Sequence, residues 1–428
     1  MSIFNDEFLN RRGFLGAAAA GAAASGYLIG CKPTTTASRQ PILPKVEGFE
    51  MASYDPEDYV GYTPVNDRKI RVGIVGYGVC RFGALFEFQA HPNVEVVAVS
   101  DLFPDRCETL AKETNCKKMY PSLEEMVKDD SIEAIFLATD APSHARHAIL
   151  TLEHGKHVAC AVPAVFGSLE DADKLYETVK RTGLKYMMFE TSCYHADNHA
   201  MREIYKAGGF GKIVYAEGEY FGGPSSPPDY KAKEAKLGSY KGWRRCMPPQ
   251  WYITHATAYY VGVTGGSFTE VSCMGGPTLY ERYRLKDPHY NPYNNPFATE
   301  IAFMRTNEGG MARMGKSNDT PGNGGEKGRV RGQLGSWYGG DKGKYVGHMK
   351  NLPDLKRPPL PPGVNAGGHG RSHGRLMNEF VRSILQDRQP LVDISMALNM
   401  TVCGVVAHQS ALRDGELMKI PQYQPLSA

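Results

Sequence analysis

One strand–turn–helix stretch near the start of the folded region constrains this chain more than any other. Ile70–Val75 is a short, β-branched, apolar run, which predicts a buried parallel strand. Gly76 and Gly78 follow, and then a helix-like segment in which Arg81 takes the usual third-glycine position and Gly83 lies two residues beyond. Amides at such a helix start can cradle a pyrophosphate, so the stretch predicts a Rossmann-type dinucleotide-binding unit. Its candidate cofactor contacts are Gly76, Tyr77, Gly78 and Arg81.

The next apolar run supports this interpretation and indicates the cofactor. The sequence VEVVAVSD ends in Asp101, about twenty residues past the turn, where an acid accepts the adenosine ribose hydroxyls. No basic residue follows before Arg106, and Asp101 would repel a 2′-phosphate. NAD is therefore expected rather than NADP. The alternative for Asp101 is a helix-capping role after the strand.

Strands and helices continue to alternate after Asp101. A third run, IEAIFLATD, ends at Asp140, and a loop, a helix and a strand at Lys156–Cys160 follow. This alternation predicts a doubly wound parallel sheet. Ligands bind at the carboxyl ends of such strands, so residues 138–144 and 161–165 are expected near the nicotinamide.

Composition limits the remaining possibilities. The 428 residues suffice for two domains, and 49 basic against 46 acidic residues give a net charge of +3, which offers no case for a nucleic-acid partner or an anionic membrane surface. The nine cysteines show neither a CxxC pair nor a Cys/His metal spacing, so most are interpreted as buried hydrophobic residues and no metal site is expected.

The N-terminus reads as an export signal. Arg11 and Arg12 precede a short run of small apolar residues, which resembles a twin-arginine signal; an ordinary secretory signal or a weak anchor is the alternative. The residues before Cys31 resemble a lipobox, which implies cleavage and a lipid on that cysteine, although a chance cysteine gives the same pattern. Residues 1–31 are thus expected to be the signal and residues 32–68 a tether. The expected location is the periplasm or cell envelope.

Several motifs together resemble the Gfo/Idh/MocA oxidoreductase superfamily. They are the Gly76–Gly78 turn, Asp101, TDAPSHA, GKHVACAVPA and GKIVYAEGEY, and the match runs from about Lys69 to Pro421. The resemblance implies an α/β protein: an N-terminal Rossmann domain at 69–190, a substrate-binding α/β domain at 191–370 with a large open, mostly antiparallel sheet, and C-terminal helices at 371–428 that pack back on the core. It also implies a homo-oligomer. By position His144 would lie near the nicotinamide ribose, unless it only caps a helix.

Two departures from the family pattern point to a sub-branch. Ordinary members carry Glu-Lys-Pro, where this chain has Ala161, Val162 and Pro163; they also carry Asp-x-Gly-x-His, where this chain has His255 and Tyr259 near the two end positions. The NAD-dependent α-N-acetylgalactosaminidases of the superfamily share Val-Pro. Their other motifs resemble Tyr252–His255, Glu190–Tyr194, and His369-Gly370 or His373-Gly374.

That branch implies net hydrolysis through a retained NAD. A sugar hydroxyl is oxidised, the C1 substituent is eliminated, water adds and the hydride returns, so no pair of carboxylates is needed. The candidate catalytic residues are His255, whose ordinary pKa near 6.5 suits a base, with Tyr252 and Tyr194, which would need a nearby cation. Packing, capping or sugar stacking are the alternatives. Candidate substrate-rim residues ahead of a C-terminal amphipathic helix are His369 and His373, unless that stretch is a solvated helix start.

Three functions remain open from the sequence. The first is a carbohydrate-active NAD enzyme that returns its own hydride. The second is an ordinary NAD-dependent sugar or 3-keto-glycoside oxidoreductase, which export disfavours because free NAD is scarce outside the cytoplasm. The third is a non-catalytic carbohydrate-binding surface lipoprotein, since fold does not determine function.

Overall fold

A computed structural model describes residues 54–78, 80–222, 243–277, 291–320, 325–338 and 346–426. The expected export signal, Cys31 and the tether up to residue 53 lie outside the described residues. Within the described part of the chain, no helix combines the length and apolarity needed to cross a bilayer.

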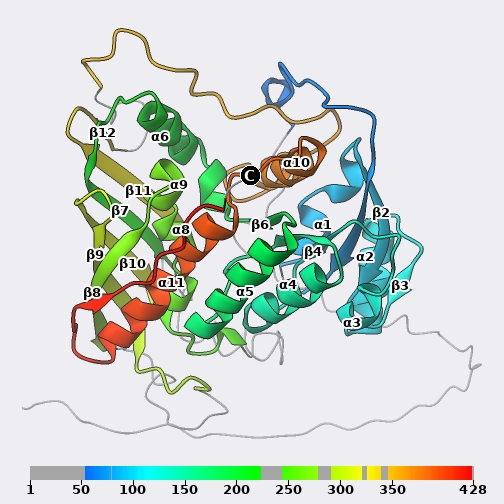
Figure 1. Cartoon of the computed structure of the whole chain (residues 1–428), viewed down its shortest axis with the longest axis horizontal. Helices are drawn as coiled ribbons and strands as arrows, with labels where there is room; N and C mark the ends of the chain where they lie inside the picture. The colour runs from blue at the N-terminus through cyan, green and yellow to red at the C-terminus, as the bar shows by residue number, and fades with distance from the viewer. Residues whose placement is uncertain are drawn as a thin grey trace, which may run out of the picture. The chain divides into compact units, whose positions relative to one another are not determined.

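The first sheet is parallel and six-stranded, in the order β3-β2-β1-β4-β5-β6 (Figure 1). All of its strand pairings are parallel, with β1 between β2 and β4, so the predicted doubly wound sheet is confirmed. Strands buried on both faces carry near-continuous apolar runs, which explains why these strands could be predicted from the sequence. The strands are β1 (Ile70–Val75), β2 (Val94–Ser100), β3 (Met119–Tyr120), β4 (Ala134–Leu137), β5 (His157–Cys160) and β6 (Tyr186–Met188).

Short and medium helices connect these strands. The longest of them, α5, begins after Ser168, whose hydroxyl accepts the Asp171 amide, and ends at Gly183, which has the positive φ (65°) that suits glycine. The α-helices are α1 (Phe82–Leu85), α2 (Pro104–Glu113), α3 (Leu123–Met126), α4 (His144–Glu153) and α5 (Leu169–Thr182). The 3-10 turns are η1 (Pro56–Asp58), η2 (Phe88–Ala90), η3 (Ala141–Ser143) and η4 (Thr191–Tyr194).

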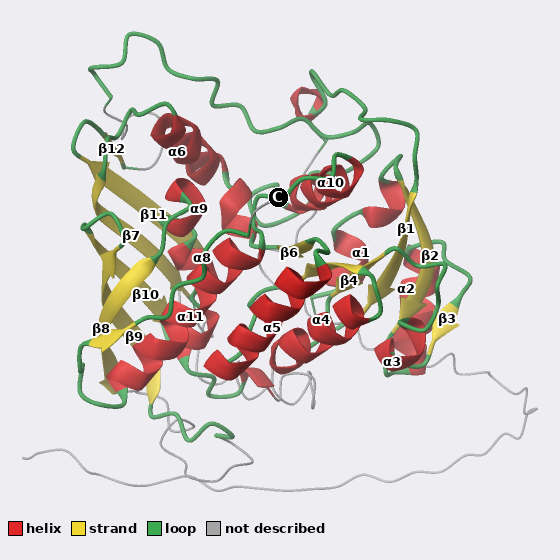
Figure 2. Cartoon of the chain, in the orientation of Figure 1, coloured by secondary structure: helices red, strands yellow, loops and turns green. Residues whose placement is uncertain are grey.

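The second sheet has seven strands in the order β12-β11-β7-β10-β9-β8-β13 (Figure 2). Among the described residues of this sheet, only the β10–β7 pair is parallel; the other pairs are antiparallel, which confirms the expected mostly antiparallel sheet. The strands are β7 (Ile213–Phe221), β8 (Phe268–Pro277), β9 (Phe297–Thr306), β10 (Met311–Ser317), β11 (Gly325–Gly332), β12 (Ser336–Trp337) and β13 (Met418–Lys419).

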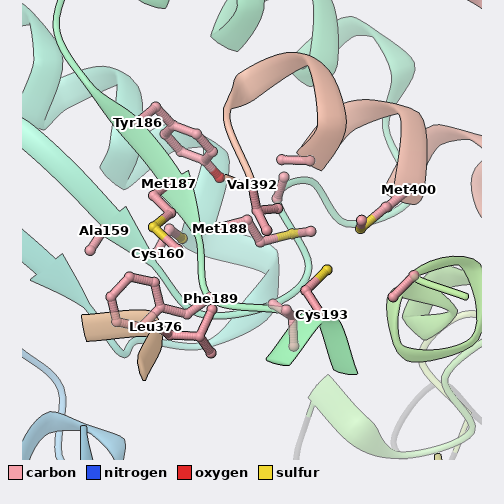
Figure 3. Close-up of a cluster of buried hydrophobic side chains, with 14 of the residues drawn as sticks. Ala159, Cys160, Tyr186, Met187, Met188, Phe189, Cys193, Leu376, Val392 and Met400 are labelled. Atoms are coloured by element: carbon pink, nitrogen blue, oxygen red, sulfur yellow. The ribbon is translucent and has the colours of Figure 1, made fainter. Parts of the chain in front are cut away.

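The C-terminal helix α11 joins the two sheets. It contacts β8 of the second sheet as well as α5 and the edge strand β6 of the first, and its residues are buried nearly all round. Met188 at the end of β6 donates its amide to Val392 just before α11 (3.1 Å), and Figure 3 shows these side chains in one buried cluster with Met400. The remaining helices are α6 (Ala196–Lys206), η6 (Pro249–Tyr252), α8 (Thr254–Thr257), α9 (Val261–Thr264), α10 (His373–Leu385) and α11 (Ile394–Ala411).

Helix α10 returns to the first sheet. Asn378 Oδ1 lies 3.1 Å from His91 Nε2, and the Phe380 ring lies against Phe88. The start of the helix is held by Arg375, which forms an ion pair with Asp58 in the segment before β1 (2.7 Å). These contacts fix α10, and with it the loop that precedes the helix, against the first sheet.

Candidate active site

A cavity of about 610 Å³ lies between the carboxyl edge of the first sheet and one wall of the second. The first wall comes from the glycine turn after β1, from Asp101 after β2, from residues 138–144 after β4, and from Ala161 and Val162 after β5. The opposite wall is formed by Tyr220, Trp243, Arg244, Tyr252, His255 and His369. Carboxyl ends of parallel strands are where ligands bind in such sheets, so this cavity is the candidate site.

The glycine turn has the geometry that a bound pyrophosphate needs. Gly76 has φ = 102°, and a Cβ there would lie 2.4 Å from the carbonyl oxygen of Ala138. Gly78 faces open space. The irregular third position is also explained: Arg81, with φ = 49°, lies just before α1, and Gly83 supplies the close packing, since a Cβ there would lie 2.5 Å from Gly76 O.

Asp101 ties the turn to the second strand. Its Oδ2 accepts the Tyr77 amide (2.7 Å) and its Oδ1 accepts the Phe103 amide (2.9 Å), while the residue also lines the cavity. Phe103, not Asp101, occupies the N-cap position of α2. The carboxylate therefore fixes the turn while the residue lines the cavity. The sequence placed Tyr77 at the cofactor, and the structure assigns its backbone a part in holding Asp101.

His144 and Pro163 form one unit where the loops after β4 and β5 meet. His144 Nδ1 lies 2.8 Å from the Pro163 carbonyl oxygen and Nε2 lies 3.2 Å from that of Thr139. The ring is buried, and burial lowers the pKa of His144. A neutral imidazole that links two strand-end loops is thus a positioning group for this wall. The Val162–Pro163 bond is cis.

The opposite wall centres on a buried cluster of Glu190, His255 and Glu326. His255 Nδ1 lies 2.8 Å from Glu190 Oε1 and 3.6 Å from Glu326 Oε1. The edge-on rings of Tyr220 (4.7 Å) and Tyr252 (5.5 Å) enclose the imidazole. Because Glu190 occupies Nδ1, Nε2 is the ring nitrogen left for a ligand in the cavity.

This cluster changes the protonation state expected of His255. Burial lowers the pKa of His255, but the carboxylates of Glu190 and Glu326 outweigh it and raise the pKa to about 9. The expectation from its ordinary pKa, a ready acceptor near neutrality, is therefore corrected: at pH 7 the resting imidazole holds a proton. It must release that proton before it can act as a base.

Glu326 also gathers groups around the cluster. Its Oε2 accepts the Ser192 hydroxyl (2.6 Å) and lies 3.2 Å from His195 Nε2. The Tyr259 hydroxyl donates to the Glu326 backbone carbonyl (3.2 Å). Ser192 and His195 thus hold the carboxylate and Tyr259 holds the backbone, so Glu326 does not depend on His255 alone for its position.

The structure places three of the residues predicted from the sequence, and only one of them lines the cavity. Tyr194 is buried with the guanidinium of Arg202 5.7 Å from its ring, and it does not line the cavity, so its expected place at the reacting sugar is wrong. His373 is buried with its ring 4.4 Å from that of Phe86, which corrects its expected place at the substrate rim. His369 does line the cavity, and its Nδ1 lies 2.8 Å from His373 Nε2.

Comparison with known protein families supports a nucleotide-binding role for the segment that forms the first wall. Residues 70–190 match the family model described as "Oxidoreductase family, NAD-binding Rossmann fold", the Gfo/Idh/MocA family. This segment is an NAD-binding Rossmann domain. The predicted NAD cofactor is thereby confirmed, and Gly76, Gly78 and Asp101 are the residues whose geometry fits it.

Curated relatives match part of the chain. It is 30% identical over 196 residues to a glycosyl hydrolase family 109 protein of Bacteroides fragilis, covering 44% of this chain and 42% of the relative. A family 109 protein of Bacteroides thetaiotaomicron is 30% identical over 160 residues, covering 35% and 34%. The aligned region thus spans less than half of each relative.

Solved structures match more of the chain at lower identity. Scyllo-inositol dehydrogenase of Lactobacillus casei with NAD(H) and scyllo-inositol has a TM-score of 0.61 and 16% identity, covering 82% of this chain and 99% of that one. Levoglucosan dehydrogenase with NADH and L-sorbose has a TM-score of 0.63 and 16% identity, covering 83% and 100%. At this identity the match shows a shared fold.

Two groups on the side opposite the NAD-binding domain had no sequence signal. Glu326 is the second residue of β11, an ordinary-looking Gly-rich strand, and nothing in that strand marks it. Arg244 precedes η6, with its guanidinium 4.0 Å from the Trp243 ring and 5.3 Å from that of Tyr252. Burial raises the pKa of Tyr252, Arg244 opposes the rise, and the pKa reaches about 12, so Tyr252 keeps its proton at neutrality.

The described residues offer one group that could also hold a metal ion, again Glu190, His255 and Glu326, whose ligand atoms lie within 4.8 Å of one another. The 2.8 Å contact between His255 Nδ1 and Glu190 Oε1 explains the arrangement without a metal, because the two atoms share a proton in a charge-assisted hydrogen bond. We therefore interpret the group as a proton-sharing cluster.

Proposed function

We propose that this protein is an NAD-dependent enzyme that acts on a sugar hydroxyl and achieves net glycoside hydrolysis with its cofactor retained. The carrying observation is that one cavity brings the NAD-binding turn to face the Glu190–His255–Glu326 cluster. The partial likeness to family 109 glycosyl hydrolases supports the glycosidase assignment.

The chemistry divides between the cofactor and the second wall. Bound NAD would supply reversible hydride transfer at a sugar carbon, which makes oxidation, elimination, addition of water and reduction a closed cycle. His255 would first release its Nε2 proton to solvent and then accept the hydroxyl proton at Nε2, while Glu190 and Glu326 hold the ring and stabilise its charged form. Tyr252 would serve as a hydrogen-bond donor to the sugar, because it keeps its proton.

Val162 lies where ordinary family members carry lysine, and it is buried against the cavity. An aliphatic side chain there can pack but cannot move a proton. The proton-handling group is consequently placed on the opposite wall, at His255. Pro163 would retain a positioning role through its carbonyl contact with His144.

Two measurements together test this proposal: whether the purified protein retains its cofactor, and whether it turns over without added NAD. Purified protein should release NAD(H) on acid treatment and should cleave at least one member of a chromogenic glycoside panel without added NAD. His255→Ala should abolish cleavage and keep the cofactor. Cleavage unaffected by His255→Ala would contradict the assignment.

A second function is favoured by the dehydrogenase folds. An NAD-linked sugar or polyol dehydrogenase would use the same two walls, and neighbours of that kind match over more than 80% of this chain. It would accumulate NADH with a free sugar and need added NAD. Bound carbohydrate with neither turnover nor nucleotide would instead indicate the non-catalytic binding protein.

We further propose export by the twin-arginine route, with a lipid on Cys31 and a homo-oligomeric assembly. The support for export is the Arg11-Arg12 motif, and for lipidation the residues ahead of Cys31. Arg11→Lys with Arg12→Lys should block export of a reporter fusion, and Cys31→Ala should release the protein from membranes. Light scattering on the mature protein tests the assembly.

A further inference from the structure

Two cations stand at the substrate wall beside Tyr220. Arg244 lines the cavity directly. Lys316, on β10, is buried, and its Nζ lies 4.3 Å from the centre of the Tyr220 ring, which itself lines the cavity and contacts His255. The two side chains therefore bring positive charge to the part of the wall next to the proton-sharing cluster.

Neither cation has an acidic partner among the residues that the structure describes. Arg244 stands over the faces of Trp243 and Tyr252, and its Nη2 lies 3.9 Å from Cys80 Sγ. Lys316 Nζ donates to Ser317 O (3.0 Å) and to Asn318 Oδ1 (2.8 Å).

The same sheet shows the contrasting arrangement elsewhere. Arg313 and Arg329 both pair with the carboxylate of Glu217. These two arginines are thus neutralised by an acid, whereas Arg244 and Lys316 are met by neutral groups.

Cations without an acidic partner at a partly desolvated site favour the binding of an anion. Removing a cation from water without an anion is costly, and an incoming anion recovers part of that cost. The cost is visible at Lys316, where burial and then the charge of Arg244 lower the pKa to about 7. Arginine binds planar oxyanions in a bidentate manner, so it is the group of this pair suited to direct contact.

We propose that Arg244 binds an anionic substituent on the sugar, a carboxylate or a sulfate ester, so that the site selects acidic carbohydrates. This inference rests on the proposed carbohydrate function and names its substrate class. Lys316 would add to the field through Tyr220 without touching the ligand. The pyrophosphate of the cofactor is the other possible source of an oxyanion, because Cys80 follows the glycine turn.

The experiment measures binding, so that it does not depend on turnover. Calorimetry on the NAD-loaded protein compares hexuronates (glucuronate, galacturonate, mannuronate) with their neutral hexoses, and 6-sulfated hexoses form a second arm. Arg244→Met tests the proposed contact. Arg331→Met, an exposed arginine on β11 outside the cavity, is the matched control. NAD retention is measured for each variant.

At least one acidic sugar should bind the wild-type protein tenfold or more tightly than its neutral partner. Arg244→Met should remove that preference and leave NAD retention within twofold, and Arg331→Met should change neither. Equal binding of acidic and neutral sugars would overturn the proposal. So would a loss of NAD in Arg244→Met with the acid preference intact, because the anion would then be the pyrophosphate.

The two proposals can fail separately. Neutral glycosides cleaved without any acid preference would preserve the proposed function and refute the anionic subsite. Tight acidic-sugar binding without NAD-dependent turnover would support the subsite and refute the proposed function.

Discussion

Replacing Glu326 with glutamine should return the pKa of His255 from about 9 to near its ordinary value of 6.5. Glu326 Oε1 lies 3.6 Å from His255 Nδ1. At an effective dielectric constant of about 20, two unit charges at that separation interact by roughly 4–5 kcal/mol, or about 3 pKa units. Burial, which acts in the opposite direction, would then offset most of what Glu190 still contributes.

The change is large enough to read at one pH. At pH 7.5 an imidazole of pKa 9 is about 97% protonated, and one of pKa 6.5 is about 10% protonated. Titration of ¹⁵N-histidine-labelled protein by NMR measures this directly, with the His255 signal assigned by its loss in His255→Ala. No substrate is required.

Glu217→Gln provides the control, because Glu217 is also a carboxylate of the second sheet but pairs with Arg313 away from the cavity. It should leave the His255 pKa unchanged. A His255 pKa that stays near 9 in Glu326→Gln would refute the reasoning, since Glu190 alone would then set the protonation state. Equal shifts in both variants would point to a general change in the sheet.

Four further outcomes are expected. Because the folded-state pKa of His255 is raised, the charged imidazole contributes its full stabilisation of the fold below pH 6.5, and this contribution is lost as the pH rises through 9. The free energy of unfolding in urea should therefore differ by about 3 kcal/mol between wild type and His255→Gln at low pH, and the difference should disappear by pH 10. Asp101→Ala should weaken NAD binding roughly 10- to 100-fold in equilibrium dialysis, because the Tyr77 and Phe103 amides lose their acceptor; unchanged affinity would count against its ribose role. Val162→Lys should give no gain in activity and a lower melting temperature, because it buries an amine at a position that only packs; a faster enzyme would contradict the proton assignment. His373→Ala should cost about 2–4 kcal/mol of stability by denaturation and leave sugar binding intact, whereas His369→Ala should do the reverse; sugar binding that depends on His373 would restore it to the substrate rim.

The first wall was predictable because its information is local. The β1 strand, the Gly76 turn and Asp101 occupy about thirty consecutive residues, and each element has its own sequence pattern. Even the irregular Arg81 is resolved within the same stretch, since Gly83 takes over the close contact with Gly76. The mostly antiparallel second sheet was expected only from the family resemblance, because no local pattern in that half of the sequence indicates a strand order.

The second wall could be predicted only in part. Sequence reasoning named His255 and Tyr252, which do line the cavity together, but it used an unperturbed pKa for the histidine. It also placed Tyr194 and His373 at the sugar, and both are buried elsewhere, because a motif position does not say which way a side chain points.

The sequence by itself determined the NAD-binding half, the cofactor and the position of the central histidine. Only the tertiary structure decided the charge on that histidine and the character of the wall around it. Glu190 caps the start of η4, His255 and Glu326 lie in α8 and β11, and Arg244 comes from the segment before η6. A pKa depends on burial and on charges within a few ångströms, and neither quantity exists until distant segments have been brought together.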